Sequence, residues 1–370
     1  MAVKWLIILF SISIFCSSAD SSDASMTFKE PFYSDVSCKG RYDILEDKSV
    51  ALIGSASSVE FQIKSDSVIL YLQSEYKHGN SFVITINDLY QGRYLLNDDE
   101  IRDIRIGLSK NEKSKIGIFK ATEAATGNLI VRAIESSSPL NKIPDRSKTI
   151  EFIGNSITCG AAADTQTIPC GTAYYHDQHN AYLAYGPRIA RALDVDFFLS
   201  SVSGIGIYRN WNDEHDKEPI MPEVYENLYL NAPVSKPYSF QVKPDIVSIC
   251  LGTNDLSGGD GIKERLPFNR KAFVSNYIDF VKTVRSHYSD AQIILLSSPV
   301  VHGENHKVLL ECLNEIQRGL EPEIEVDIFD MEPFTASGCT GHPSIDDHRR
   351  IADALIPTFE SMLEKSETNK

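Results

Sequence analysis

The sequence predicts two domains, an all-β jelly-roll sandwich followed by an α/β domain whose parallel sheet is flanked by helices. Between residues 28 and 135, short β-branched and aromatic runs are separated by Gly, Asn and Asp, the pattern of strands joined by turns. After residue 148, apolar runs of strand length alternate with segments of helical periodicity, which is typical of a parallel sheet. The 370 residues also exceed what one hydrophobic core usually organises.

The first segment, residues 1–19, has the features of a secretory signal peptide. Lys4 provides a basic start, residues 5–15 form an almost unbroken apolar run, and residues 17–19 are small, as a cleavage site requires. The apolar run is shorter than the roughly 20 residues that span a bilayer, which argues against the alternative of a membrane anchor. We therefore expect a secreted protein that has no membrane contact once this leader is removed.

The first domain is expected to be a β-sandwich over residues 28–135. Its alternating runs and the turn residues between them favour a sandwich or jelly roll. The clearest strands are expected at residues 59–63, 68–72, 82–86, 116–119 and 129–134. A break at Ser136-Ser137-Ser138-Pro139 opens the expected linker, residues 136–147.

The second domain, residues 148–364, is expected to alternate strands with helices. In such sheets the chemistry lies beyond the carboxyl ends of the strands. Strands are expected at 150–153, 195–202, 246–251, 293–297 and 324–329, and helices at 182–193, 268–287, 307–320 and 345–364. The polar residues 365–370 are expected to be a frayed tail.

The charge and the cysteines restrict the classes of partner. A formal net charge of −15 makes nucleic acid and anionic polysaccharides such as pectate poor partners, so neutral substrates are favoured. Cys16 leaves with the leader, and the sequence does not choose among pairings of the remaining cysteines. Cys250 lies in an apolar run and is expected to be a buried thiol. No Cys/His spacing of a zinc site occurs, so we expect no metal.

Four short segments carry candidate chemistry, and three of them follow expected strands. Ser156 follows the first strand of the second domain, Gly204 the second, and Asn254 the third, while His342 precedes the last helix. A serine hydroxyl becomes a nucleophile when a neighbouring base accepts its proton, and His342 is the candidate base. The sequence therefore predicts Ser156 and His342 as the catalytic pair.

The same segments offer donors for an oxyanion hole. Attack on an ester builds negative charge on the carbonyl oxygen, which the N–H groups of Ser156 and Gly204 and the amide of Asn254 are expected to stabilise. Taken singly, such a Ser is usually a helix cap, such an Asn part of a turn, and such a His a loop residue. Their order and placement together favour the catalytic interpretation.

These segments resemble the four blocks of the SGNH, or GDSL, hydrolases, and more closely carbohydrate esterase family two. The similar segments are IEFIGNSITCG (150–160), SGIGIYRNW (203–211), LGTND (251–255), SGCTGHPS (337–344) and FKATEAATG (119–127). The resemblance implies a jelly roll joined to an SGNH hydrolase domain, and removal of acetyl groups from plant-cell-wall sugars such as xylan or glucomannan. It implies an acyl-enzyme mechanism without a cofactor.

Two positions depart from the superfamily pattern. Asn155 stands before the nucleophile where Asp is usual, and Cys339 stands three residues before His342 where many members have an orienting Asp. A thiol is a poor orienter of imidazolium. The resemblance therefore implies a Ser-His dyad oriented by a main-chain carbonyl, of Thr340 or Cys339. The alternative is a triad completed by a carboxylate such as Asp346 or Asp347.

The sequence says less about the substrate and about the residues that contact it. Trp211 and Tyr208 are candidates for contact with sugar rings, although aromatic residues at such spacing are more often core. Arg209 is expected to form a structural ion pair, and no role is assigned to His176 or His179. The alternatives to a carbohydrate O-acetyl esterase are an esterase acting on another small ester, and a carbohydrate-binding protein whose catalytic domain has decayed.

Overall fold

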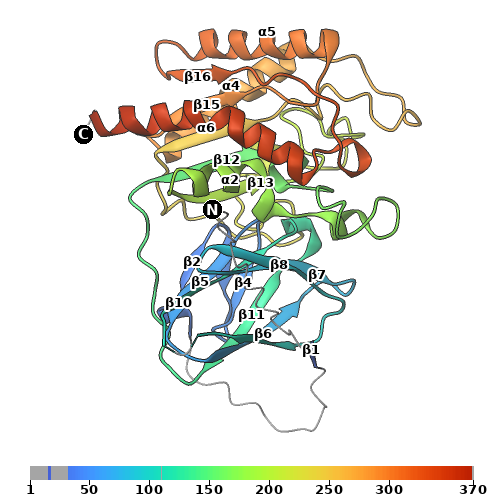
Figure 1. Cartoon of the computed structure of the whole chain (residues 1–370). Helices are drawn as coiled ribbons and strands as arrows, with labels where there is room; N and C mark the ends of the chain where they lie inside the picture. The colour runs from blue at the N-terminus through green and yellow to red at the C-terminus, as the bar shows by residue number, and fades with distance from the viewer. Residues whose placement is uncertain (1–15, 18–31, 110, 369–370) are drawn as a thin grey trace, which may run out of the picture.

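The computed structural model describes residues 16–17, 32–109 and 111–368 (Figure 1). Most of the expected leader, residues 1–19, lies outside the described residues. Its residues Cys16–Ser17 form a two-residue strand, β1, that pairs with β9. None of the described helices is both long and apolar enough to span a membrane.

Two antiparallel sheets form the first domain, as the alternating runs predict. One sheet has the strand order β1-β9-β6-β11-β4-β3, and the other has the order β2-β5-β10-β7-β8. Phe61, Leu70, Phe82, Ile118 and Val131 meet between the sheets in one apolar cluster. The strands are β2 (Ser37–Lys39), β3 (Tyr42–Ile44), β4 (Val50–Leu52), β5 (Ser58–Ile63), β6 (Ser67–Ser74), β7 (Asn80–Ile86), β8 (Leu89–Leu96), β9 (Arg102–Gly107), β10 (Ser114–Lys120) and β11 (Leu129–Ser136), with the 3-10 turns η1 (Phe32–Asp35) and η2 (Ala124–Thr126).

The structure adds strands that the sequence pattern did not predict. β2, β3 and β4 have three residues each, which is too short for an alternation to be visible. β8 is largely exposed or half-buried, and it contains Gly92 and Arg93 where an apolar pattern would be needed. Both kinds of strand form because their neighbours offer hydrogen bonds, not because of their own pattern.

The second domain is built on a five-stranded sheet in which every neighbouring pair is parallel. The strand order in the sheet is β13-β12-β14-β15-β16. The chain adds β13 on one side of β12 and the later strands on the other side, so its direction of winding reverses between β12 and β14. Ligands of such sheets bind at this switch point. The strands are β12 (Thr149–Gly154), β13 (Asp196–Ser201), β14 (Ile246–Cys250), β15 (Gln292–Leu296) and β16 (Val326–Phe329).

Helices cover both faces of this sheet (Figure 1). α2 and α6 share one apolar cluster with one face, and α4 and α5 share another cluster with the opposite face. The helices are α1 (Ser156–Cys159), α2 (Tyr185–Ala192), α3 (Met221–Val224), α4 (Arg270–His287), α5 (Gly303–Leu320) and α6 (Ile345–Thr368), with the 3-10 turns η3 (Tyr175–Gln178), η4 (Ala181–Leu183) and η5 (Cys339–Gly341).

Several helix boundaries differ from expectation; α5, for example, begins at Gly303, four residues before the expected start. The helix expected at 182–193 is divided into η4 and α2, and Pro187 lies in the first turn of α2, where its missing N–H leaves no internal hydrogen bond unmade. α6 continues to Thr368, so the expected frayed tail is helical over its first residues.

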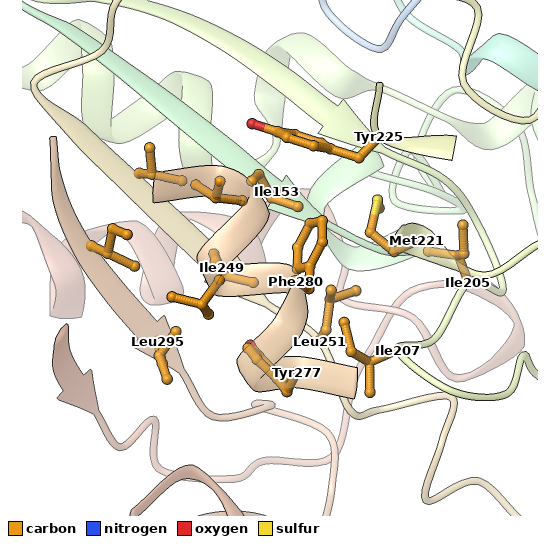
Figure 2. Packing of buried hydrophobic residues seen from close by; sticks show 14 of the residues in the cluster. Ile153, Ile205, Ile207, Met221, Tyr225, Ile249, Leu251, Tyr277, Phe280 and Leu295 are labelled. Carbon is orange, nitrogen blue, oxygen red and sulfur yellow. The ribbon is translucent and has the colours of Figure 1, made fainter. Parts of the chain in front are cut away.

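The core beneath α4 also anchors the loops that leave the sheet (Figure 2). Ile205 and Ile207, which follow β13, and Leu251, which follows β14, belong to the same buried cluster as Tyr277 and Phe280 of α4. These loops therefore begin in close-packed core, and packing fixes their course at the edge of the sheet.

Buried polar contacts join the two domains. The Arg41 guanidinium, fully buried, donates to Ser200 Oγ at 3.0–3.1 Å and to the carbonyls of Tyr225 and Asn227. Lys39 pairs with Asp196 at 2.5 Å. Because these contacts link the sandwich to β13 and to the loop after α3, the two domains form a continuous packed unit.

Candidate active site

Ser156 lies directly beyond the carboxyl end of β12, as predicted, at the first position of α1. Asn155 caps this helix, since its Oδ1 accepts the N–H of Ile157 at 3.0 Å. The tight turn needs Gly154, where a Cβ would meet Thr158 Oγ1 at 2.1 Å and the carbonyl of Cys250 at 3.1 Å. The amide at 155 thus serves as a neutral cap in the place where the superfamily pattern has Asp.

His342 lies against Ser156 although the two are far apart in the sequence. His342 Nε2 is 2.9 Å from Ser156 Oγ. His342 Nδ1 is 3.2 Å from the carbonyl oxygen of Thr340 and 3.1 Å from Thr340 Oγ1. The Thr340 hydroxyl donates its own proton to the carbonyl of Cys339, so both groups near Nδ1 act as acceptors. This arrangement keeps the proton on Nδ1 and leaves the Nε2 lone pair for the serine hydroxyl.

The carbonyl that orients His342 comes from a strained position. Thr340 has φ 52° and ψ 34°, in the left-handed region that a β-branched residue rarely adopts. Such a conformation costs on the order of 1–3 kcal/mol and is found mainly at functional sites. Here it turns the Thr340 carbonyl toward the imidazole, which is one of the two main-chain options that the sequence left open.

In the part of the chain that the structure describes, neither a thiol nor a carboxylate bonds to the His342 ring. Cys339 is joined to Cys170 in a disulfide, a pairing that the sequence left open, so it offers no thiol to the imidazole. Asp347 Oδ2 accepts from the Ser337 and Ser344 hydroxyls, and Asp346 pairs with Arg349. The alternative of a triad through either aspartate is therefore contradicted by these contacts.

The predicted oxyanion donors surround the same cavity as the nucleophile. Gly204 has φ 77°, which favours glycine, and its carbonyl accepts the N–H of Trp211 at 2.7 Å. Among the described residues, no protein acceptor takes the N–H of Ser156 or Gly204. Asn254 Nδ2 donates one hydrogen to the carbonyl of Ile205 at 2.7 Å, which orients the amide while its second hydrogen remains for a ligand.

Asp255 holds the loop that carries Gly204. This fully buried carboxylate accepts the N–H groups of Ile207 and Tyr208 at 2.9–3.1 Å and 3.0 Å. The Arg209 guanidinium donates to the carbonyl of Asp255 and pairs with Glu214 at 3.0 Å, so the expected structural ion pair is confirmed. The loops after β13 and β14 are thereby joined below the site.

Two hollows meet at Ser156 and His342. A cavity of 690 Å³ includes Gly204 and Asn254, and one of 290 Å³ extends past Asn254 toward Asn305. Trp211 lines both hollows, and 46% of the residue is exposed. The larger hollow is also lined by Asn212, Asp213, Lys217, Glu218 and Lys263.

Tyr208 does not line either hollow. Its ring packs edge to face against Phe268 and Phe273, and its hydroxyl accepts the N–H of Asn269 at 3.0 Å. The sequence could not separate Tyr208 from Trp211, because the two lie three residues apart in one loop and only the turn decides which of them faces the cavity.

Three further residues contact the site and received no role from the sequence. The Tyr175 hydroxyl lies 3.2 Å from His342 Nε2, and its ring packs edge to face on His179 at 4.8 Å between centroids. His179 Nε2 is 3.3 Å from Glu123 Oε1. Glu123 belongs to the FKATEAATG segment of the first domain, so that segment was the one available signal.

Burial favours the neutral form of the candidate base. Burial lowers the pKa of His342 below its usual value, and the imidazole of His179 acts in the same direction. The carbonyls of Cys339 and Thr340 and the charge of Glu123 oppose this shift only in part. The base is therefore ready to accept a proton at neutral pH.

Another cavity lies away from the catalytic residues. It has a volume of 1040 Å³, lies between the domains around Lys39, Arg146 and Asp196, and is lined by no member of the predicted catalytic set. No group of three or more His, Cys, Asp or Glu among the described residues is arranged to hold a metal ion.

Comparisons with known proteins agree with this fold. The model of the GDSL-like Lipase/Acylhydrolase family matches residues 152–350. An acetylxylan esterase/glucomannan deacetylase of Cellvibrio japonicus (strain Ueda107) is 30% identical over 253 residues, 66% of this chain and 68% of that protein. A family two carbohydrate esterase from Clostridium thermocellum, solved in complex with cellohexaose, is 23% identical, covers 89% of this chain and 99% of its own, and has a TM-score of 0.78. A family two carbohydrate esterase from Cellvibrio japonicus is 20% identical, covers 95% of this chain and 99% of its own, and has a TM-score of 0.79.

Proposed function

Since the chain belongs to the GDSL-like lipase/acylhydrolase family and is a carboxylic-ester hydrolase, we propose that it removes O-acetyl groups from neutral plant-type polysaccharides such as xylan or glucomannan. The proposed mechanism uses a Ser-His dyad and an acetyl-enzyme. We also propose that residues 1–19 act as a secretory leader and that the activity lies outside the cell, which the basic start and the short apolar run support.

The contact between Ser156 and His342 is the observation that carries this proposal. With the proton of the imidazole held on Nδ1 by the Thr340 carbonyl, Nε2 accepts the proton of Ser156 as Oγ attacks the acetyl carbonyl. His342 then returns that proton to the sugar oxygen as the ester bond breaks, which leaves acetyl-Ser156. In the second half, His342 takes a proton from water, the hydroxide attacks acetyl-Ser156, and acetate departs as Oγ recovers its proton.

The oxyanion donors lower the barrier of both halves. The N–H groups of Ser156 and Gly204 and the free hydrogen of the Asn254 amide stabilise the carbonyl oxygen as it gains negative charge. They are held in place before the reaction, since loop packing and Asp255 fix the segments that carry them. A dyad without a carboxylate can therefore rely on the donors for much of its rate.

The substrate class follows from the cavity and the surface charge. Trp211 presents an exposed ring beside Ser156, which suits stacking on the apolar face of a sugar. The net charge of −15 disfavours anionic polymers. The relative from Cellvibrio japonicus is named for acetylxylan and glucomannan, and we extend that substrate class to this chain.

Acetate release from purified protein tests the proposal. The wild type should hydrolyse 4-nitrophenyl acetate and release acetate from acetylated xylan or glucomannan. Ser156→Ala should keep the fold, measured by thermal unfolding, and should lose several orders of magnitude in kcat. Activity on 4-nitrophenyl acetate alone would indicate another small ester as substrate, and binding of the polymers without hydrolysis would indicate a decayed enzyme that serves as a binding protein.

A further inference from the structure

One carboxylate of the first domain lies beneath the oxyanion loop of the second. Glu123 follows β10 of the sandwich, yet its Oε2 accepts the backbone N–H of Ser203 at 2.6 Å. Ser203 directly precedes Gly204, whose N–H is one of the proposed oxyanion donors. Only 5% of Glu123 is exposed, so this contact is shielded from water.

The backbone around Glu123 is fixed so that the side chain points out of the sandwich. Its carbonyl accepts from the buried Lys120 ammonium at 2.7 Å and from the Thr126 hydroxyl at 2.7 Å. Lys120 also donates to the carbonyl of Ile53 at 2.7 Å. These bonds tie the turn at Glu123 to the rest of the first domain.

The second oxygen of Glu123 reaches toward the His342 side of the site. Oε1 lies 3.3 Å from Nε2 of the fully buried His179, whose Nδ1 accepts the N–H of Ala162. Nε2 therefore carries the proton of a neutral His179 and donates it to Glu123. Tyr175 packs on the ring of His179, and its hydroxyl contacts His342 Nε2 at 3.2 Å.

Glu123 stays ionised in this buried place. Burial opposes its charge, but the hydrogen bonds from His179 and from the N–H of Ser203 hold the pKa of Glu123 below its usual value. A charge-assisted hydrogen bond is shorter and stronger than a neutral one, and a fixed acceptor therefore restrains the Ser203 peptide strongly.

We infer that Glu123 is a positioning residue of the active site, which holds the Ser203-Gly204 peptide for oxyanion stabilisation and, through His179 and Tyr175, supports the packing around His342. The first domain is thus a part of the catalytic apparatus and not a separable carbohydrate-binding module. This inference rests on the proposed function, because it assigns Gly204 to the oxyanion hole.

Another carboxylate of the same domain provides a matched comparison. Glu60 is also 5% exposed, pairs with Lys115 at 3.2 Å, and faces the catalytic domain in a small hollow with Tyr182 and Arg191. That hollow contains no residue of the Ser203 loop. If the loss of any buried carboxylate at the domain boundary lowered activity, variants of Glu60 and of Glu123 would lose activity equally.

Glu123→Gln tests the inference with little change in size. The amide can accept from Ser203 or from His179 but not from both, because its NH₂ group faces the other donor. We expect kcat on 4-nitrophenyl acetate to fall by about 10- to 100-fold with KM within about twofold of wild type, since one oxyanion donor contributes on the order of 100-fold.

The affinity for a boronic acid that forms a tetrahedral adduct on Ser156 should fall in parallel, because such an adduct resembles the transition state. Glu60→Gln should leave kcat and boronate affinity unchanged.

The outcomes separate this inference from the proposed function. If wild type hydrolyses no ester, the proposed function is wrong. If wild type is active and Glu123→Gln keeps its kcat, or loses no more than Glu60→Gln, the inference about Glu123 is wrong. Glu123→Asp, which keeps the charge but is too short to reach both donors, replaces Glu123→Gln if the latter does not fold, with the same expected loss. Failure of both variants to fold would contradict the inference by showing that the carboxylate is needed for the structure as a whole.

Discussion

The two sides of the active site are held in different ways. Ser156, Gly204 and Asn254 follow three neighbouring strands of the parallel sheet, and their loops begin in the core under α4. His342 instead lies between η5 and α6, in a segment that belongs to no strand. The sheet therefore brings the nucleophile and the oxyanion donors to one edge, where Asp255 and Glu123 hold the Gly204 loop, whereas the base follows no strand and needs constraints of its own.

Those constraints are local cross-links. The Cys170–Cys339 disulfide joins the His342 segment to the chain before η3, and the N–H of Gly338 donates to the carbonyl of His342 at 2.8 Å. Asp347 holds the same segment through Ser337 and Ser344. A main-chain carbonyl can replace an orienting carboxylate here because the loop that carries the carbonyl is itself held on both sides of His342.

The larger loss of activity is expected when one oxyanion donor is removed from the sheet side of the site, which comprises Ser156, Gly204 and Asn254. Asn254→Ala takes away an oxyanion donor and the hydrogen bond to the Ile205 carbonyl, so kcat should fall on the order of 100-fold, about 3 kcal/mol, with a smaller change in KM. Steady-state kinetics on 4-nitrophenyl acetate measures both constants. A rise in KM at unchanged kcat would exclude Asn254 from the oxyanion hole.

An intermediate loss of activity is expected when the disulfide is removed from the loop side of the site, which carries His342. Because Cys339 is bonded to Cys170, a single Cys339→Ala change would also free a thiol, and the double variant Cys170→Ala/Cys339→Ala is the cleaner test. We expect a loss of about 2–5 kcal/mol in the free energy of unfolding, measured in urea. We also expect kcat to fall by about tenfold because His342 is less well oriented.

The free thiol of Cys38 supplies the control for that comparison. Cys38→Ala should leave kcat unchanged, and reductant should lower the activity of wild type but not of the double variant. Wild-type kcat in the double variant would show that the disulfide does not help to hold the base.

The smallest effect is expected at Thr340. Thr340→Ala removes the hydroxyl near Nδ1 but keeps the carbonyl, so kcat should change by less than about threefold if the carbonyl orients the imidazole. The activity of both proteins should rise with pH as His342 loses its proton. Because burial lowers the pKa of His342, the midpoint should lie below the ordinary value of about 6.5. A large loss in Thr340→Ala, or a midpoint above that value, would contradict this account of the dyad.

The sequence revealed the sheet side of the site better than the loop side, for a physical reason. A strand followed by a glycine turn is a local pattern, and parallel strands bring their carboxyl ends together, so Ser156, Gly204 and Asn254 could be placed from the sequence. The carbonyl of Thr340 depends on one left-handed backbone position, and the Cys170–Cys339 bond joins residues 169 positions apart. No local pattern encodes such contacts.

The same reason explains why Glu123 received no role. The segment around it was noticed for its resemblance, but only the packing of one domain on the other shows that its carboxylate meets Ser203. In the fold, strands with a clear apolar pattern, such as β5, β6, β12 and β14, were predicted, whereas β2, β3, β4, β8 and β9 depend on pairing with neighbours.

In the proposed mechanism, acetyl transfer passes through Ser156, with His342 as a base that no carboxylate among the described residues orients. The most direct test is to mix wild type with 4-nitrophenyl acetate, quench with acid on the millisecond scale, and locate the acetyl group by peptide mass spectrometry. We expect one acetyl group on Ser156, formed together with a burst of 4-nitrophenol and absent from Ser156→Ala. An active enzyme that carries the acetyl group on another residue, or that releases acetate without any acetylated Ser156, would contradict it.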